Sequence, residues 1–369
     1  MTRGFSVWLD VLRIVATLAV VISHLAYLRF THGALQFLRD WNIGSDAVIV
    51  FFVISGLVIA YAAERDGNGR TFAFNRLTRL WSVMLPALLL TYAFDITGYG
   101  IRPEAYPSTF YHAHPAGEFF LRGLTFSNEY MLFGRMRLGT NGPLWSLSYE
   151  AAYYALFGIA IFLRGATRIV ALVAIAVLVG INILLLMPAW LMGVWAWHRM
   201  RDGRFAADSR VVALLCAVAG PGAYVAAVAL GLPEWLRQVT ANVLGVSDAR
   251  GVIGFSDEFI WNAIIGGLTL LHLFGMARLL QGFKGKARAV RWAAGASFSV
   301  YVTHYPALHL LDAALPLDMV GRAVALLVGS LAVGLVFASI FERRLPAIRT
   351  AMRRLWPARP QTDATQSPR

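Results

Sequence analysis

Long apolar runs are the feature that most constrains this sequence. Ten of them are separated by polar or basic segments, and most are close to the roughly 20 residues that a helix needs to cross a bilayer. Only 14% of the residues are charged, whereas a soluble domain carries about 25%. The sequence therefore predicts an all-α polytopic membrane protein. The expected spans are residues 7–28, 43–63, 80–98, 143–163, 168–187, 189–198, 209–231, 257–280, 293–313 and 321–341.

The region 168–198 decides the number of spans, because it is long for one helix and short for two. A hairpin is expected to turn at Met187 and Pro188. With ten spans, 23 of the 33 Lys and Arg residues lie in cytoplasmic segments and 9 outside; with one helix over 168–198 these numbers become 10 and 22. Since basic residues favour the cytoplasmic side, we expect ten spans with both termini cytoplasmic. The net charge of +13 then reflects topology and not a nucleic-acid surface.

The rest of the sequence gives four further expectations. The long loop 99–142 is rich in aromatic residues, which favours an ordered and functional segment, whereas the polar residues 359–369 are expected to form a disordered cytoplasmic tail. Cys216 is the single cysteine, which excludes an internal disulfide and a Cys-based zinc cluster. No metal site is expected, since His112 and His114 have no third ligand at suitable spacing.

The first expected span contains three ionisable residues on one helix face. Arg13 and His24 are eleven residues apart, which is about three helical turns, and Asp10 lies three residues before Arg13. Because ionisable side chains are costly inside a membrane, their presence indicates a functional site. Taken one at a time, Arg13 is also explained by snorkelling and His24 by a packing hydrogen bond. Together on one face, they favour a cation near the cytoplasm and a proton-transfer group towards the far side.

The same residues carry a family resemblance. Asp10, Arg13 and His24 resemble the first-helix motif of the acyltransferase family 3 membrane proteins, bacterial O-acyltransferases of cell-surface glycans. Further similarities follow in order along the chain: Asp46 with Phe51-Phe52 and Ser55-Gly56, Arg76-Leu77-Thr78-Arg79, Trp145-Ser146-Leu147 with Glu150, and Ser299-Val300-Tyr301 with His304. Ser82 stands where the family often has proline, and Ala151 follows the glutamate where an acid or glutamine is usual. The resemblance implies that residues 1–358 form a transmembrane acyltransferase domain.

The resemblance also implies roles for the cationic residues. An acyl-CoA donor carries several phosphates, which planar guanidinium groups bind well. Ordinary positive-inside charge explains Arg65 and Arg70, whereas the resemblance assigns Arg76 and Arg79, together with Arg13, to binding of the donor.

Proton transfer is expected to fall to a second group of residues. His24 is the candidate base, because histidine titrates near neutral pH and can return the proton to the leaving thiolate. Glu150 and Asp46 are expected to approach His24, Glu150 at the same depth in the membrane. The alternatives are a helix N-terminal acid for Glu150 and an N-cap for Asp46. Asp10, Trp145, Ser299, Tyr301 and His304 are second-tier residues, and a helix-packing hydrogen-bond network explains the last three equally well.

The sequence thus predicts an enzyme of the bacterial inner membrane that moves an acyl group, most simply acetyl, from cytoplasmic acyl-CoA to a hydroxyl of a glycan or glycolipid. Acyl-CoA is expected as a substrate and not as a tightly bound cofactor. Direct transfer and an acyl-histidine intermediate both remain open. The alternative is a transporter or flippase of a lipid-linked glycan that uses Arg13 and His24 as a relay. The acceptor and the oligomeric state are not encoded in any recognisable motif.

Overall fold

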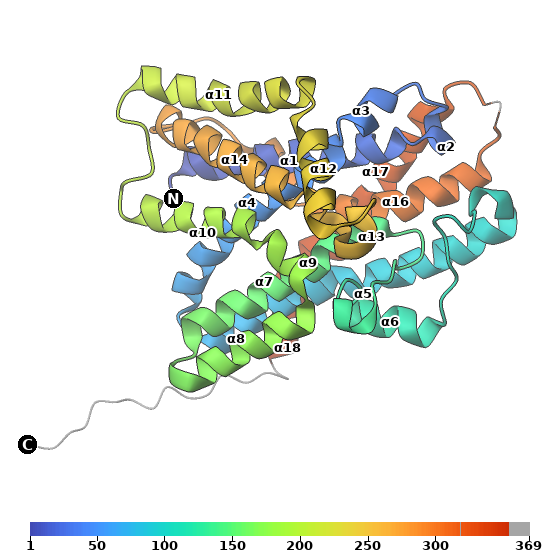
Figure 1. Ribbon diagram of the computed structural model, residues 1–369, viewed down its shortest axis with the longest axis horizontal. Helices are drawn as coiled ribbons and strands as arrows, with labels where there is room; N and C mark the ends of the chain where they lie inside the picture. The colour runs from blue at the N-terminus through green and yellow to red at the C-terminus, as the bar shows by residue number, and fades with distance from the viewer. Residues whose placement is uncertain (318, 354–369) are drawn as a thin grey trace, which may run out of the picture.

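The computed structural model describes residues 1–317 and 319–353, and over this part of the chain every regular element is helical (Figure 1). The longer helices are α1 (Arg3–Leu25), α4 (Ile43–Asp66), α5 (Gly69–Ile101), α7 (Trp145–Phe162), α8 (Gly165–Val179), α10 (Met187–Arg201), α11 (Arg210–Ala229), α14 (Phe259–Leu279), α16 (Ser297–Ala314) and α17 (Arg322–Ile340). The shorter helices are α2 (Leu28–Thr31), α3 (Gln36–Asp40), α6 (Ala116–Leu124), α9 (Ile181–Leu185), α12 (Leu232–Leu244), α13 (Ala249–Ile253), α15 (Arg288–Ala294) and α18 (Leu345–Arg353). Short 3₁₀ turns occupy Pro103–Ala105, Met131–Phe133, Gly142–Leu144, Gly254–Ser256 and Glu342–Arg344.

The predicted all-α class is confirmed, and each of the ten expected spans overlaps one of the longer helices. Within the described residues, six helical segments are long and apolar enough to cross a membrane by length and composition. They are α1, α4, α5, α11, the segment Ala249–Leu279 that includes α14, and the segment Arg322–Arg353 that includes α17. α8 and α10 are only 15 residues long, or about 22 Å, which is shorter than a typical bilayer core. The count of ten spans stays a prediction.

The region 168–198 forms two helices, but the chain breaks earlier than expected. α8 ends at Val179, and Gly180 follows as its C-cap residue. The φ of Gly180 is +91°, a conformation that glycine adopts without strain and other residues do not. The single turn α9 follows, and Pro188 then lies in the first turn of α10, where its missing N–H costs no hydrogen bond. Met187 and Pro188 therefore begin a helix, whereas the sequence placed the turn of the hairpin there.

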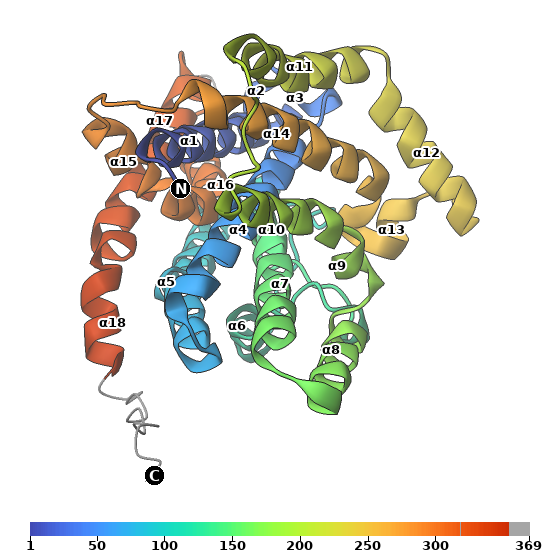
Figure 2. The ribbon, with the colours of Figure 1, turned by 90° about the vertical axis from the view of Figure 1, so that its left-hand side faces the viewer.

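The helices pack in groups that both views separate clearly. α11 and α14 lie together on one side of the molecule, and α7 and α8 lie together on another (Figures 1 and 2). α1 packs against α4 and α16, while α16 also packs along α5 and α17. α1, α4, α5, α7 and α16 thus converge on one region, and they supply almost all the candidate site residues.

α4 and α10 cross at an unusually close contact made by glycine. A Cβ added at Gly193 would overlap the carbonyl oxygen of Val53, and one added at Gly56 would overlap the carbonyl oxygen of Trp190. Small residues at such a crossing let two backbones approach without loss of packing. Gly56 directly follows Ser55, so this contact fixes α4 beside the site described below.

Residues 102–144 form an ordered connection between α5 and α7. Asp95 of α5 accepts hydrogen bonds from the backbone and side chain of Thr140, and Asn141 donates to Thr91 and to the Val302 carbonyl. Burial raises the pKa of Glu129 in this connection to about 7, because water is lost around its carboxyl group. The expected tail, residues 359–369, lies outside the described residues.

We predict that Gly193→Ala destabilises the protein although alanine has the higher helix propensity. The added methyl group must displace the α4 backbone, and such overpacking typically costs about 1–3 kcal/mol. The measurement is the thermal unfolding midpoint of the purified protein in detergent. The control is Gly267→Ala in α14, where an added Cβ would meet no atom within 4 Å; this variant should unfold at or above the wild-type midpoint. A Gly193→Ala protein as stable as Gly267→Ala would contradict the proposed crossing.

Candidate active site

Two pockets lie next to each other along α1 and share Val48 and Tyr301 as wall residues. The first, here called the arginine pocket, has a volume of about 100 Å³, and the second, the histidine pocket, has about 810 Å³. The polar residues of the arginine pocket are Arg13, Ser55, Arg76, Arg79, Ser146, Glu150, Tyr154, Ser297 and Tyr301. Those of the histidine pocket include His24, Tyr27, Arg39, Arg137, Trp145, Glu258, Tyr301 and Tyr305. α1 thus presents Arg13 to one pocket and His24 to the other.

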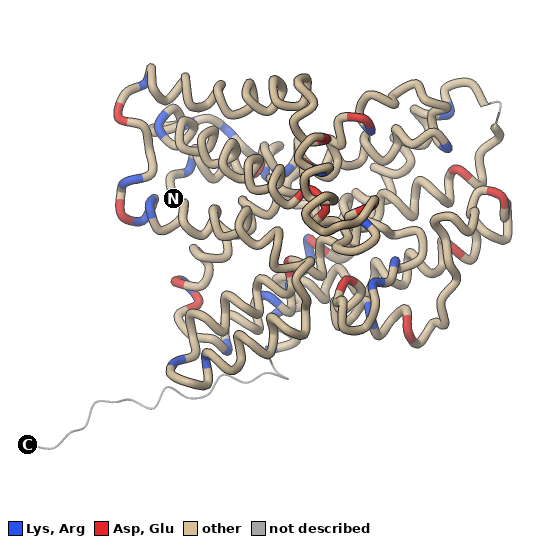
Figure 3. The backbone as a smooth tube through the Cα atoms, viewed as in Figure 1, with Lys and Arg blue, Asp and Glu red and all other residues tan. Residues whose placement is uncertain are grey.

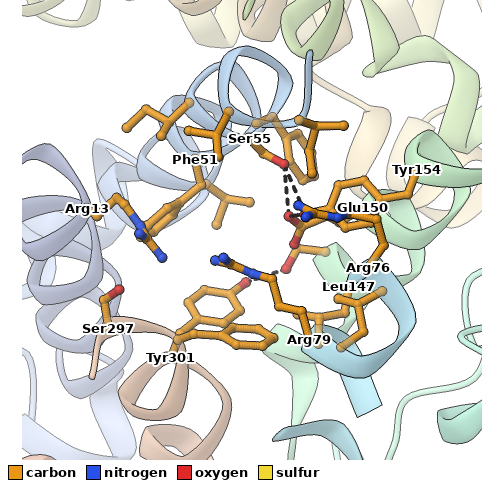
Figure 4. Close-up of a pocket in the computed structure, with 18 residues that line it drawn as sticks. Arg13, Phe51, Ser55, Arg76, Arg79, Leu147, Glu150, Tyr154, Ser297 and Tyr301 are labelled. Carbon is orange, nitrogen blue, oxygen red and sulfur yellow. Dashed lines mark hydrogen bonds between the residues drawn. The ribbon is translucent and has the colours of Figure 1, made fainter. Parts of the chain in front are cut away.

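The arginine pocket contains more positive than negative charge. Arg13 from α1 and Arg79 from α5 point into it from opposite sides, and Arg76 lies beside Glu150 (Figure 4). Arg13 has a long ion pair of 3.9 Å with Asp10, and Arg76 lies 3.6 Å from Asp66. Arg79 has no carboxylate within 4.0 Å among the described residues. An anionic ligand would supply the missing charge, since buried cations are normally paired.

Glu150 belongs to the arginine pocket. Its carboxylate accepts hydrogen bonds from the Tyr154 hydroxyl and, at 2.9 Å, from Ser55 Oγ, which in turn accepts one from Trp190 Nε1 at 3.3 Å (Figure 4). Tyr301 separates this network from His24, because it lines both pockets. Glu150 forms no hydrogen bond with His24 among the described residues, and the depth of the two residues in the membrane stays a prediction. The N-terminal alternative is excluded, because Glu150 lies beyond the first turn of α7.

His24 forms a hydrogen-bonded pair with His304. His24 Nδ1 lies 2.8 Å from His304 Nε2, and His304 Nδ1 lies 2.7 Å from the Tyr301 carbonyl oxygen and 3.1 Å from that of Val300. A carbonyl oxygen only accepts, so His304 carries its proton on Nδ1 and its Nε2 is an acceptor. His24 must then donate through Nδ1, which leaves the lone pair on its Nε2. The pair therefore holds His24 in the tautomer that a general base requires.

Tyr301 is held firmly in the wall between the two pockets. Its hydroxyl donates to the Pro143 carbonyl oxygen at 3.0 Å and lies 2.7 Å from Ser146 Oγ. Trp145, expected in the second tier, lines the histidine pocket and stacks on Phe255 with ring centroids 4.3 Å apart. The motif containing Trp145 and the motif containing Tyr301 thus meet at this wall.

Four predicted residues line neither pocket: Asp10, Asp46, Ser299 and His304. Asp46 is buried and accepts hydrogen bonds from the Tyr224 hydroxyl at 2.9 Å and from Trp261 Nε1 at 3.2 Å, so it joins α4 to α11 and α14. It forms no hydrogen bond with His24 among the described residues, and it is not the N-cap of α4, a position that Asn42 occupies without a side-chain capping bond. Ser299 donates its backbone N–H to Glu342 at 2.9 Å and does not line either pocket.

Several residues of the site were not predicted from the sequence. Ser55 lies inside a motif that was recognised, but its contact with Glu150 depends on how α4 and α7 pack. Tyr154 follows Glu150 by one helical turn, a spacing that would have identified it. Tyr27 and Tyr305 contact His24 with ring centroids 6.0 Å and 4.6 Å away, and no sequence pattern points to them. In the described part of the chain, no group of three or more His, Cys, Asp or Glu side chains is arranged to hold a metal ion.

Comparison with known proteins agrees with this arrangement. The chain is 31% identical over 152 residues to the acyltransferase MdmB of Streptomyces mycarofaciens, a match that covers 40% of this chain and 36% of that protein. It is 28% identical over 155 residues to the O-acetyl transferase of Shigella phage Sf6, covering 41% of this chain and 45% of that protein. Each match thus spans less than half of the relative. No solved structure shows significant similarity.

The family match covers far more of the chain than either relative does. Residues 6–339 fit the family described as "Acyltransferase domain", and this range contains both pockets and every predicted site residue. Its apolar helices are those of a multi-pass membrane protein. The chain therefore belongs to the acyltransferase 3 family of membrane proteins.

Proposed function

We propose that this protein is an O-acetyltransferase of a bacterial inner membrane, with ten spans and both termini in the cytoplasm. It takes an acetyl group from cytoplasmic acetyl-CoA and transfers it to a hydroxyl group of a glycan or glycolipid on the far side. The orientation is supported by the charge distribution, because Lys and Arg gather at the end of the molecule where the N-terminus lies (Figure 3). The O-acetyl transferase of phage Sf6 supports the choice of acetyl and of an oxygen acceptor.

The observation that carries this proposal is the pairing of two pockets of different chemistry across Tyr301. One pocket is cationic, through Arg13, Arg76 and Arg79, and the other presents the free Nε2 of His24. Acetyl-CoA is a long molecule with its thioester at one end and its phosphates towards the other. Such a donor fits a site divided into a cationic pocket and a pocket that contains His24. The phosphates bind in or near the arginine pocket, and the thioester end lies beside His24 in the histidine pocket.

The proposed reaction uses His24 first as a base and then as an acid. His24 Nε2 takes the proton of the acceptor hydroxyl, and the oxygen attacks the carbonyl carbon of the thioester. The C–O bond forms, the C–S bond breaks, and the sulfur leaves as a thiolate that takes the proton back from His24. The products are the acetyl ester and free coenzyme A, so neither atoms nor electrons are left over.

We expect His24→Ala to lower acetyl transfer by at least about 100-fold, the usual contribution of a general base. The assay uses purified protein in lipid nanodiscs with radiolabelled acetyl-CoA, and coenzyme A release is followed chromatographically. The control is His112→Ala, an exposed histidine outside both pockets. Normal turnover in His24→Ala would exclude the proton-transfer role. Glycan movement across the membrane without thioester consumption would favour a transporter instead.

We predict that Arg76→Gln with Arg79→Gln raises the KM for acetyl-CoA more than tenfold and changes kcat little. The sharper measurement compares acetyl-CoA with S-acetylpantetheine, which lacks the phosphates. The wild type should prefer acetyl-CoA strongly, and the variant should lose that preference because the guanidinium groups act only on the phosphates. Arg164→Gln, an exposed arginine outside the pocket, is the control. An unchanged preference would refute phosphate binding at these residues.

We predict that His304 acts as a positioning residue. His304→Ala should lower kcat with little change in the KM of either substrate, because His24 then loses the acceptor that fixes its tautomer. His304→Gln should recover part of the activity, since its amide oxygen can accept the same proton. Thr303→Ala is the control, because among the described residues its hydroxyl bonds only the Ser299 carbonyl oxygen of its own helix. Equal losses in the alanine and glutamine variants, with a raised KM, would point to a merely structural role.

A further inference from the structure

A third pocket of about 730 Å³ adjoins the histidine pocket and shares Tyr27, Arg39 and Asp40 with it. It lies between the α1–α4 connection and the segment that follows α5. Its polar and aromatic lining consists of Tyr27, Arg29, Gln36, Arg39, Asp40, Arg102, Glu104, Thr109, Phe110 and Asp312. A ligand in this pocket therefore lies next to whatever occupies the histidine pocket.

Two guanidinium groups share one aromatic ring in this pocket. The Arg39 guanidinium lies 4.0 Å from the centroid of the Tyr27 ring, and that of Arg29 lies 4.9 Å from it. Arg29 also lies 3.9 Å from the centroid of Phe110, and its Nη1 atom is buried without a hydrogen-bond partner among the described residues. Cation–π contacts offset only part of the cost of burying a cation, and two like charges this close repel each other.

The carboxylates that line the pocket do not neutralise these two arginines. Asp312 is paired with Arg102 at 3.1 Å and with Arg322 at 2.6 Å, and Asp40 accepts from Gln36 at 3.0 Å. Glu104 is exposed and forms no ion pair within the described part of the chain. Arg29 and Arg39 likewise have no carboxylate within 4.0 Å among the described residues.

Arg137 extends the same positive region into the histidine pocket. It lines that pocket, donates to the Phe110 carbonyl oxygen at 3.2 Å, and has no ion pair among the described residues. Tyr27 links the region to the reacting group, since its ring centroid lies 6.0 Å from that of His24 and the two rings are stacked. The positive charge is therefore arranged around His24 on the side away from the arginine pocket.

We propose that Arg29 and Arg39 form an anion subsite for the acceptor, so that this enzyme acts on an acceptor that carries an anionic group. The anion is a phosphate or a carboxylate attached to the glycan or to its lipid carrier. Guanidinium groups bind both by paired hydrogen bonds. This inference rests on the proposed function in one respect, which is that the acceptor reaches His24 through this pocket.

The test measures binding of three probes to the full-length protein in phosphatidylcholine nanodiscs, without any donor. The probes are hexagalacturonate, a short polyprenyl phosphate and neutral maltohexaose. We expect the wild type to bind at least one anionic probe about tenfold or more tightly than maltohexaose. We expect this preference to weaken with added salt, since ions screen charges that water reaches. The carboxylate and phosphate probes distinguish an acidic sugar from a phosphate-bearing lipid carrier.

The variant Arg29→Gln with Arg39→Gln should lose the preference for the anionic probe and keep any weak binding of maltohexaose. Arg164→Gln with Arg168→Gln, two exposed arginines outside the pockets, changes the net charge equally and should bind as the wild type does. The variant Arg29→Lys with Arg39→Lys keeps both positive charges and should retain most of the preference. It therefore shows whether a loss in the glutamine variant comes from the missing charge or from misfolding.

Two outcomes would overturn the subsite. One is a wild type that binds neutral and anionic probes equally, and the other is a folded double glutamine variant that keeps the wild-type preference. Because the binding assay contains no acetyl-CoA, its result is separate from the turnover assay. A wild type that binds an anionic probe but never consumes acetyl-CoA would refute the proposed function and leave the anion site standing.

Discussion

A charged side chain among apolar helices must be compensated, and this constraint organises the whole molecule. Arg13 and Arg76 each have a carboxylate at the edge of ion-pair distance, supplied by Asp10 and Asp66. Arg79 has none among the described residues. The pattern leaves positive charge in one cavity that protein groups do not neutralise. The fold therefore carries a cost in the empty state that binding of an anion in this cavity would remove.

Two of the helices that contain candidate site residues do not qualify as membrane spans by length and composition. α7 and α16 are among the longer helices of the structure but not among the six segments that qualify by length and composition. α7 contains Glu150, and α16 contains His304 and Asp312, and such residues lower the apolarity of a helix. These helices are held among their neighbours by hydrogen bonds and close packing, so they need not face lipid along their whole length.

The sequence predicted the helical class and the positions of the helices well, because apolar periodicity and length are local properties. It also grouped Arg13, Arg76 and Arg79 correctly as neighbours, on the basis of motif order and family resemblance. It failed where the answer depends on rotation and depth within the bundle. Glu150 was expected to approach His24, yet the two residues line different pockets that share Tyr301 of a distant helix as a wall residue. Nor does any local pattern reveal that His304 fixes the tautomer of His24, since 280 residues separate the two.

The crossing of α4 and α10 has a consequence for how this protein can change over time. Its closeness depends on the absence of side chains at Gly56 and Gly193, so no substitution there adds a contact. At most packed positions, evolution can substitute residues of similar volume while the neighbouring side chains adjust. A contact between two backbones does not allow such stepwise substitution. Ser55 is next to this crossing and bonds Glu150. The part of the site nearest the crossing is therefore confined by geometry to a narrow range of sequences, whatever substrate the rest of the cavity accommodates.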